Sequence, residues 1–298
     1  LGTGYVGLVS GICLASRNHQ VRCFDTNPKT INILNSGKCH IYEKGLDDLL
    51  KSSSKNISFH LLDDKSQKLL IDSDIILVAV GTPTIDNEIN LDQIKNACLL
   101  LGNILKISKK YISIVIKSTV VPSTTDTYVK NILESTSEMK VGDFGLGMNP
   151  EFLREGSAVY DFMNPDRIVF GYEDEKTLAN LNNMYSSWDV DKLAVNTRSA
   201  EMIKYVNNSL LATQISTINE YSNIANAIGA IDFNMVMNGV HLDNRWMPFI
   251  NGKRIRPSII DYLKPGCGFG GSCFPKDVKA ISALAKTVGV NPIILDSV

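Results

Sequence analysis

The sequence predicts an α/β protein in which a doubly wound, parallel sheet is followed by a helical domain. Three observations lead to this fold class. A glycine-rich turn opens the chain, apolar strand-like runs then alternate with helix-like segments, and a long stretch without Pro or Gly follows at 199–228. Strands that alternate with helices are typical of parallel sheets. We therefore expect a sheet domain over 1–190 and a helical domain over 191–298.

A Gly-x-Gly-x-x-Gly pattern spans residues 2–7, and an apolar, helix-like stretch follows at 8–16. A strand at 20–24 then ends at Asp25. This order of turn, helix, strand and acid is typical of a Rossmann-type, dinucleotide-binding unit. The helix N-terminus would meet a pyrophosphate, and Asp25 would accept hydrogen bonds from a ribose diol, which favours NAD over NADP. The strand expected before the turn is reduced to Leu1, so we expect the front edge of the domain to be trimmed.

Strands and helices continue to alternate along the chain. We expect strands over 74–80, 113–117, 140–148 and 167–171, and helices over 92–105, 125–134 and 199–228. Asp25, Thr82, Thr119 and Glu151 each come at or just after the end of an expected strand. Parallel α/β sheets bind ligands beyond the carboxyl ends of their strands. We therefore expect these four side chains along one edge of the sheet.

The composition is that of an ordinary globular protein, with 44% hydrophobic and 20% charged residues. A net charge of −1 gives no general attraction to nucleic acid or to an anionic membrane. No apolar run is long enough to cross a bilayer.

The six cysteines follow no disulfide pattern and no signal peptide is evident, which favours a reducing, cytoplasmic setting. The four histidines show no metal-ligand spacing, so we expect no metal.

The segment 265–277 says most about the type of reaction. Four of its residues are glycines, which allow the backbone to lie close to a charged ligand. Cys273 stands just before Phe274 and Pro275, where a helix is expected to begin. The helix N-terminus and Lys276 would lower the thiol pKa and favour a thiolate nucleophile. The alternative is a buried structural cysteine. Asp277, one helical turn later, would be a base, a group that orients water, or a surface acid.

Two further clusters carry polar groups. Glu201, Lys204 and Asn208 would share one helical face, which is either functional or simply solvated. The segment 149–155 supplies two carboxylates after a strand, or simply an acidic helix start.

A thiolate is unnecessary for simple oxidation of an alcohol to a ketone. It is useful where an aldehyde is oxidised further, through a thiohemiacetal and a thioester.

With these motifs in this order, the chain resembles the nucleotide-sugar 6-dehydrogenases, the UDP-glucose/GDP-mannose dehydrogenase family. The resemblance extends from Gly2 to the C-terminus and rests on six motifs: 2–7, 80–83, 117–119, 149–155, 204–208 and 268–277. It implies oxidation of a sugar C6 alcohol to a carboxylate with two NAD+, in a homodimer formed through the helical central domain. UDP-glucose is the substrate that we expect. GDP-mannose and a UDP-N-acetylhexosamine stay open.

The resemblance also implies roles for individual residues. Cys273 would be the nucleophile, Lys204 and Asn208 would stabilise the oxyanion, Asp277 and Thr119 would activate water, and Glu155 would act in thioester hydrolysis. The sugar nucleotide would contact Glu151, Phe152, Leu153, Arg154, Glu155, Lys204, Asn208, Arg256, Tyr262, Leu263, Lys264, Pro265, Gly266 and Gly270. The cofactor would contact Gly2, Gly4, Tyr5, Val6, Gly7, Asp25, Thr82, Thr119, Glu155 and Lys276.

Three departures from the family pattern qualify the resemblance. Thr30 stands where the family often has a lysine that contacts the cofactor. Arg245 and Arg256 compete as the arginine donated across the dimer, and we favour Arg256. The family's C-terminal UDP-binding domain is absent, so we expect residues 1–298 alone to bind NAD and turn over slowly. Two other interpretations are a two-electron hydroxyacid dehydrogenase, which Cys273 argues against, and a non-catalytic NAD-binding module.

Overall fold

The computed structural model describes residues 1–85, 88–108 and 110–298. The chain forms two compact units. The first contains Leu1–Ile85 and Ile89–Lys204, and the second consists mainly of Tyr205–Val298.

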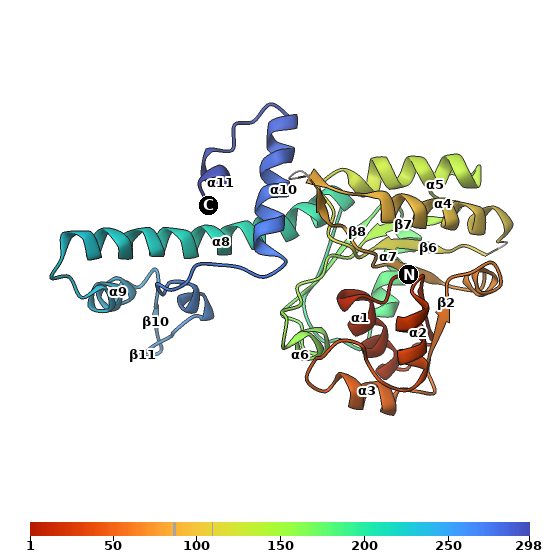
Figure 1. Cartoon of the computed structure of the whole chain (residues 1–298), viewed down its shortest axis with the longest axis horizontal. Helices are drawn as coiled ribbons and strands as arrows, with labels where there is room; N and C mark the ends of the chain where they lie inside the picture. Colours follow the sequence, from red (N-terminus) through yellow and green to blue (C-terminus); the bar gives the residue numbers. More distant parts are fainter. Residues whose placement is uncertain (86–87, 109) are drawn as a thin grey trace. The chain divides into compact units, whose positions relative to one another are not determined.

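The first unit is built on a five-stranded sheet in the order β3-β6-β7-β8-β9, with a two-stranded parallel pair, β1-β2, beside the glycine turn (Figure 1). The strands are β1 (Val21–Asp25), β2 (Ile57–Leu61), β3 (Ile75–Val78), β6 (Ser113–Ile116), β7 (Gly145–Met148), β8 (Ile168–Tyr172) and β9 (Lys192–Val195). The short strands β4 (Thr84–Ile85) and β5 (Glu88–Ile89) pair with each other. The Rossmann-type α/β class predicted from the sequence is confirmed.

Leu1 and Gly2 join the two groups of strands. The Leu1 amino group donates to Leu77 O at 2.6 Å, and Ala79 N donates to Leu1 O at 2.8 Å. Gly2 N donates to Phe24 O at 2.8 Å. The two residues thus lie between the ends of β1 and β3. Beside them is a cavity of about 600 Å³, whose lining includes residues of these two strands and of α1. It contains none of the predicted catalytic side chains.

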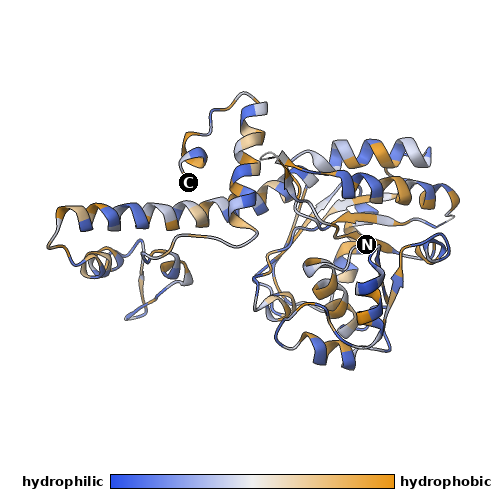
Figure 2. Cartoon of the chain, viewed as in Figure 1, coloured by the Kyte–Doolittle hydropathy of each residue, from blue (hydrophilic) through white to orange (hydrophobic). Residues whose placement is uncertain are grey.

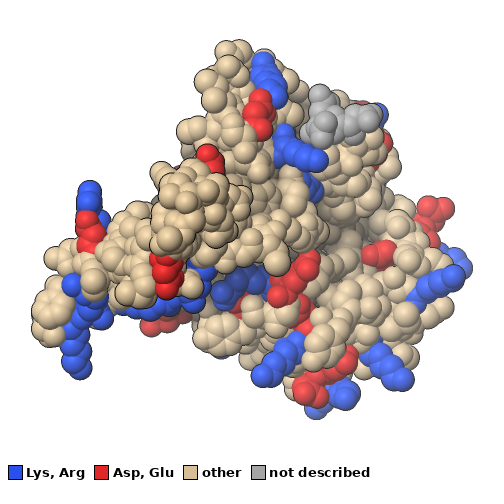
Figure 3. Space-filling model, turned by 60° about the vertical axis from the view of Figure 1, so that its left-hand side comes forward, with Lys and Arg blue, Asp and Glu red and all other residues tan. Residues whose placement is uncertain are grey.

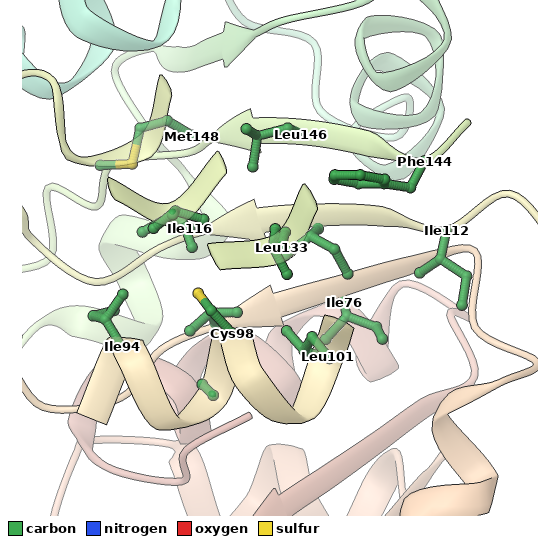
Figure 4. Packing of buried hydrophobic residues seen from close by; sticks show 14 of the residues in the cluster. Ile76, Ile94, Cys98, Leu101, Ile112, Ile116, Leu133, Phe144, Leu146 and Met148 are labelled. Atoms are coloured by element: carbon green, nitrogen blue, oxygen red, sulfur yellow. The ribbon is translucent and has the colours of Figure 1, made fainter. Parts of the chain in front are cut away.

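Helices cover both faces of the sheet. Those of the first unit are α1 (Tyr5–Ser16), α2 (Pro28–Asn35), α3 (Leu46–Ser52), η1 (Ser66–Leu70), α4 (Asp92–Ile107), η2 (Thr124–Val129), α5 (Lys130–Ser137), α6 (Ala158–Met163) and α7 (Glu175–Met184). Side chains of β6 alternate between two cores, as a strand requires. Ile114 and Ile116 belong to the core that contains residues of α4 and α5, where Figure 4 labels Ile116. Val115 packs in the core that contains α1 and α7.

Two features of this unit differ from expectation. The sheet is not wholly parallel, because β8 pairs antiparallel with β7 through Met148 and Gly171, and β9 runs parallel to β8. Residue patterns reveal a strand but not its direction, which depends on where the connection crosses. The helix expected over 125–134 is the π-helical turn η2 followed by α5, and Ser123 before it has a left-handed backbone (φ 76°).

The second unit is helical. Its long helix, α8 (Thr197–Ile228), begins in the first unit and matches the helix expected from the sequence. The other elements are α9 (Phe233–His241), β10 (Phe249–Ile250), β11 (Lys253–Arg254), η3 (Ser258–Tyr262), α10 (Phe274–Thr287) and α11 (Ile293–Ser297). Its small core contains Ile218, Met237, Ile260 and Leu263. Polar and apolar residues alternate along α8 (Figure 2), so one face packs on this core while other apolar residues stay exposed.

Acidic and basic side chains are interspersed on the face that Figure 3 shows, in keeping with the net charge of −1. Within the described ranges, no helix has both the length and the apolar character needed to span a bilayer. All six cysteines are free thiols.

Candidate active site

The glycine turn is shaped for close backbone approach. A Cβ at Gly7 would lie 2.0 Å from Gly2 O, and Gly2 itself has a left-handed backbone (φ 88°). Gly4 is the N-cap of α1, and a Cβ there would meet nothing within 4 Å. No side chain in the described part of the chain caps the first turn of α1. Its N–H groups and the positive end of its dipole therefore suit a pyrophosphate, which is the group that NAD would place there.

Asp25 ends β1 beside this turn. Its carboxylate accepts hydrogen bonds from Thr3 N at 2.8 Å, from the Thr3 hydroxyl at 2.6 Å and from Asn27 N at 2.9 Å. Burial alone would raise the pKa of this carboxyl, but the bonds from Thr3 and Asn27 outweigh burial and hold the pKa below its usual value. Asp25 is therefore an ionised acceptor, as a ribose diol requires.

The segments after β3 and β6 are tied together, since the Thr82 hydroxyl donates to Thr119 O at 2.9 Å. Both residues are partly buried. The structure thus brings together these two predicted cofactor contacts, and places Asp25 at the end of β1.

A buried polar cluster follows the end of β7. Lys204 Nζ lies 2.9 Å from Glu151 Oε1, and both residues are buried. The other oxygen, Oε2, accepts from Leu153 N at 2.7 Å, so the carboxylate is held from two sides. Lys117 Nζ donates to Asn149 Oδ1 at 2.9 Å. Two lysines and one carboxylate therefore share a site where water has little access.

Lys117 has a pKa lowered to about 8, chiefly by burial and also by the positive charge of Lys204, although Glu151 opposes the shift. Its amide partner is fixed in turn, because Asn149 Nδ2 donates to Val169 O and the Tyr185 hydroxyl donates to Asn149 Oδ1. The Lys117 ammonium therefore begins to lose its proton at mildly alkaline pH.

The rest of the loop after β7 holds side chains in different ways. The Phe152 ring lies under the Arg167 guanidinium, 4.2 Å from its centroid, and also near Lys204. Arg154 Nη2 lies 2.6 Å from Asp161 Oδ1, so Arg154 is fixed to α6. Glu155 is exposed. Lys204 thus pairs with Glu151 rather than with Glu155, the carboxylate that the resemblance placed in the acid–base steps.

In the second unit, Cys273 is the N-cap residue of α10, with Pro275 in the first turn, and the residue is partly exposed. Asp277 is 1% exposed, and its Oδ2 accepts from Asn208 Nδ2 at 2.7 Å. Lys276 Nζ lies 3.0 Å from Asp277 Oδ1. Asp277 N donates to Cys273 O at 2.9 Å, the backbone bond that closes the first turn of α10. Asp277 is therefore a buried, polar-bonded acid and not a surface one.

In the glycine loop before Cys273, Gly266 N donates to Asn219 Oδ1 at 2.8 Å. Gly268 and Gly271 have left-handed backbones (φ 89° and 75°), which other residues rarely adopt. The predicted contacts around this loop differ in exposure: Leu263 is buried, Tyr262 and Pro265 are partly buried, and Lys264, Gly266 and Gly270 are exposed.

The two competing arginines each make an ion pair of their own. Arg256 Nη2 lies 2.6 Å from Asp261 Oδ1, and Arg245 Nη2 lies 2.6 Å from Asp243 Oδ2. Both arginines are exposed residues of the second unit.

Helix α8 carries both buried clusters. Lys204 pairs with Glu151, and Asn208, four residues and one turn later, bonds Asp277. Glu201, one turn earlier, accepts from Ser123 N and Thr125 N at 2.8 Å each. All three helix residues are at most 5% exposed, so the interpretation of this face as simply solvated is wrong.

Three buried charged residues, Lys117, Glu43 and Glu201, were not among the site residues predicted from the sequence. Lys117 had a signal, because it is a charged residue that directly follows the apolar run 112–116. Glu201 had a signal in its helical spacing with Lys204 and Asn208, whereas Glu43 had none beyond its charge. Among the described residues, no group of three or more His, Cys, Asp or Glu side chains is arranged to hold a metal ion.

Comparisons with known proteins match both parts of the chain to one family. Residues 1–189 match the NAD binding domain of the UDP-glucose/GDP-mannose dehydrogenase family, and residues 198–298 match its central domain. UDP-glucose 6-dehydrogenase YwqF of Bacillus subtilis is 40% identical over 289 residues, which are 97% of this chain and 61% of the relative. GDP-mannose 6-dehydrogenase of Pseudomonas putida is 37% identical over 298 residues, 99% of this chain and 65% of the relative.

A solved structure has the same fold. A UDP-glucose dehydrogenase from the archaeon Pyrobaculum islandicum superposes with a TM-score of 0.87 at 36% identity, over 99% of this chain and 65% of that chain. The chain thus spans less than two thirds of the length of each of these three proteins.

Proposed function

Because the chain belongs to the UDP-glucose/GDP-mannose dehydrogenase family, we propose that it oxidises the C6 alcohol of UDP-glucose to the carboxylate of UDP-glucuronate. Its cofactor is NAD, which supplies a hydride acceptor for each of the two oxidations. The observation that carries the proposal is the buried ion pair of Lys204 with Glu151 in the first unit. In the second unit, the buried Asp277 accepts a hydrogen bond from Asn208.

Cys273 is assigned as the nucleophile. Its thiolate adds to the C6 aldehyde and forms a carbon–sulfur bond, and the resulting alkoxide gains a proton to give a thiohemiacetal. Loss of a hydride and of the hydroxyl proton leaves a thioester. Water then adds to the thioester carbon, the carbon–sulfur bond breaks, and the acid and the free thiol are released. The position of Cys273 before α10 supports this role, since the helix N-terminus favours a negative sulfur.

Lys204 and Asn208 suit the developing negative charge on the C6 oxygen. A buried ammonium and an amide N–H are both donors, and such donors act most strongly where water is excluded. Each is already held in place by a carboxylate, Glu151 or Asp277, so little reorganisation is needed during the reaction.

Carboxylates would carry the protons of the hydrolytic step. Glu155 keeps the role of acid–base group in thioester hydrolysis. Asp277 and Thr119 keep the role of residues that activate water. We add Glu151, because its contact with Lys204 places a carboxylate next to an oxyanion donor. Lys117, with a pKa near 8, would tune the charge of this cluster.

GDP-mannose is the second candidate substrate. The identity to the UDP-glucose 6-dehydrogenase of Bacillus subtilis, 40%, is only slightly higher than the 37% to the GDP-mannose 6-dehydrogenase of Pseudomonas putida.

The test is a panel of UDP-glucose, GDP-mannose and UDP-N-acetylglucosamine, assayed with NAD+ and the full-length protein. We expect the highest kcat/KM with UDP-glucose. A higher value with GDP-mannose would reassign the substrate and leave the chemistry intact. NADH formation with none of the three would contradict the proposed function.

We also propose that the protein is a homodimer joined through the helical unit. An apolar groove of about 510 Å³ lies along α8 and α9, and is lined by residues that include Tyr221, Ile224, Ile228, Val236 and Trp246. Large apolar side chains in such a groove are costly to leave in water. A second copy of the same groove would cover them by an isologous contact.

A further inference from the structure

Glu43 is a buried carboxylate that the proposed chemistry does not use. It lies between α2 and α3 and is 5% exposed, although its neighbour Tyr42 is 89% exposed. Among the residues that the structure describes, no Lys or Arg forms an ion pair with it. Its charge therefore depends on neutral donors, and a buried charge that loses a donor is costly.

The three donors come from two separate segments. The Tyr5 hydroxyl, in the glycine turn, donates a short hydrogen bond to Glu43 Oε1. Gly156 N donates to the same oxygen at 2.6 Å, and Ala158 N donates to Oε2 at 3.1 Å. Tyr5 is the first residue of α1, whereas Gly156 and Ala158 end the loop that carries Glu151 and begin α6. One carboxylate thus joins the turn that suits a pyrophosphate to the loop of the sugar site.

Each end of this link is held firmly. Gly156 has a left-handed backbone (φ 87°), so its N–H direction depends on a conformation that other residues rarely adopt. The Tyr5 hydroxyl also lies 3.2 Å from Arg154 O, a second contact with the same loop. Burial, and then the hydrogen bond to Glu43, raise the pKa of Tyr5, so the hydroxyl keeps the proton that it donates. Hydrogen bonds to an ionised acceptor are about twice as strong as neutral ones.

We propose that Glu43 is a positioning residue, which couples cofactor binding at the glycine turn to nucleotide-sugar binding at the loop after β7. A ligand that fixes Tyr5 also fixes Glu43, and with it the backbone from Arg154 to Ala158. By linkage, each ligand then raises the affinity for the other by the same factor. This inference rests on the proposed function, because it takes both ligands from it.

The coupling is measured in the full-length protein by titration with NADH, followed by fluorescence, with and without saturating nucleotide sugar. NADH prevents turnover, because neither ligand can then be oxidised by the other. The sugar is the one that ranks first in the substrate panel, UDP-glucose on the present proposal. We expect the sugar to tighten NADH binding about five-fold or more in the wild-type protein.

Tyr5→Phe and Glu43→Gln should each bring this factor close to one, and the double variant should show no further loss, because both remove the same link. Tyr5→Phe leaves Glu43 with its two backbone donors, so it keeps the fold and stands as the decisive variant if Glu43→Gln unfolds. Tyr42→Phe, at the exposed neighbouring position, is the matched control and should leave the factor unchanged.

Two results would overturn the inference: a factor of one in the wild-type protein, or an unchanged factor in Tyr5→Phe while both ligands still bind. Failure of the wild-type protein to bind either NADH or any sugar of the panel would instead contradict the proposed function itself.

Discussion

Lys204 and Glu151 form an ion pair of 2.9 Å in which both side chains are almost fully buried. The lysine comes from α8 and the carboxylate from the loop after β7, 53 residues earlier in the chain. A charge pair taken out of water is expensive and stays only if both partners are well bonded. Its presence fixes the position of a cation at the edge of the sheet where the strands end, which is where α/β proteins bind ligands.

Glu151→Gln should destabilise the protein strongly, because it leaves the Lys204 ammonium buried without its counter-charge. The positive charge of Lys204 already lowers the pKa of Lys117, and Glu151 opposes that shift. Loss of one partner of a buried pair costs about 3–5 kcal/mol. Urea unfolding would measure the change. Glu155→Gln, in the same loop but exposed, is the matched control and should change the unfolding free energy by less than about 1 kcal/mol. Equal effects of the two substitutions would contradict the role given to the pair.

Gly4→Ala should weaken NAD binding without harming the fold. A Cβ at Gly4 meets no protein atom within 4 Å, so it would project into the space left for the cofactor. We expect an affinity loss of roughly ten-fold in calorimetric titration and an unchanged Tm. Gly7→Ala should instead unfold the turn, because its Cβ would lie 2.0 Å from Gly2 O. Unchanged NAD affinity in Gly4→Ala would place the cofactor elsewhere.

Glu201 should make stability depend on pH. Burial raises its pKa to about 7, against bonds from Thr125 and Ser123 that lower it. Its unfolded value is near 4.5, so between these values the native state holds a proton that the unfolded state has released. The contribution of Glu201 is therefore full below pH 4.5 and is lost as pH rises to about 7, by about 3 kcal/mol.

Glu201→Gln removes this titration. Urea unfolding of both proteins from pH 4.5 to 8 should show the wild-type protein losing stability relative to the variant as pH rises. A constant difference between the two proteins across this range would show that Glu201 has the same pKa in the folded and unfolded states.

Ile228→Glu should separate the dimer. Ile228 lines the apolar groove and is 69% exposed, and a charge there could not be buried against a second chain. Ile293 is also 69% exposed but lies outside the groove, so Ile293→Glu is the matched control. Sedimentation velocity should give a monomer for Ile228→Glu and a dimer for Ile293→Glu and the wild-type protein. A wild-type monomer would contradict the proposed dimer.

Much of the fold could be predicted from the sequence, because periodicity and turn residues carry that information locally. Alternation of strand-like and helix-like runs predicted the α/β class, and the absence of Pro and Gly predicted α8 within two residues at its start. The direction of β8 could not be predicted, because a strand of the same composition can run either way.

The candidate site could be predicted only in part. The shared face of Glu201, Lys204 and Asn208 follows from their spacing on a helix. Their partners do not, because Ser123, Glu151 and Asp277 reach them through tertiary packing. Glu43 is the extreme case: nothing in its neighbourhood distinguishes it from a solvated loop acid, and only the folded chain brings Tyr5 and Gly156 to it.

The most direct test of Cys273 as the nucleophile of a four-electron oxidation is the number of NADH molecules formed for each nucleotide sugar consumed by the full-length protein. We expect two for the wild-type protein, with the sugar acid as product. Cys273→Ser should still bind NAD but form no acid, whereas Cys267→Ser, an exposed cysteine of the same loop, should keep the ratio of the wild-type protein. One NADH per sugar in the wild-type protein, or acid formation by Cys273→Ser, would contradict the covalent route.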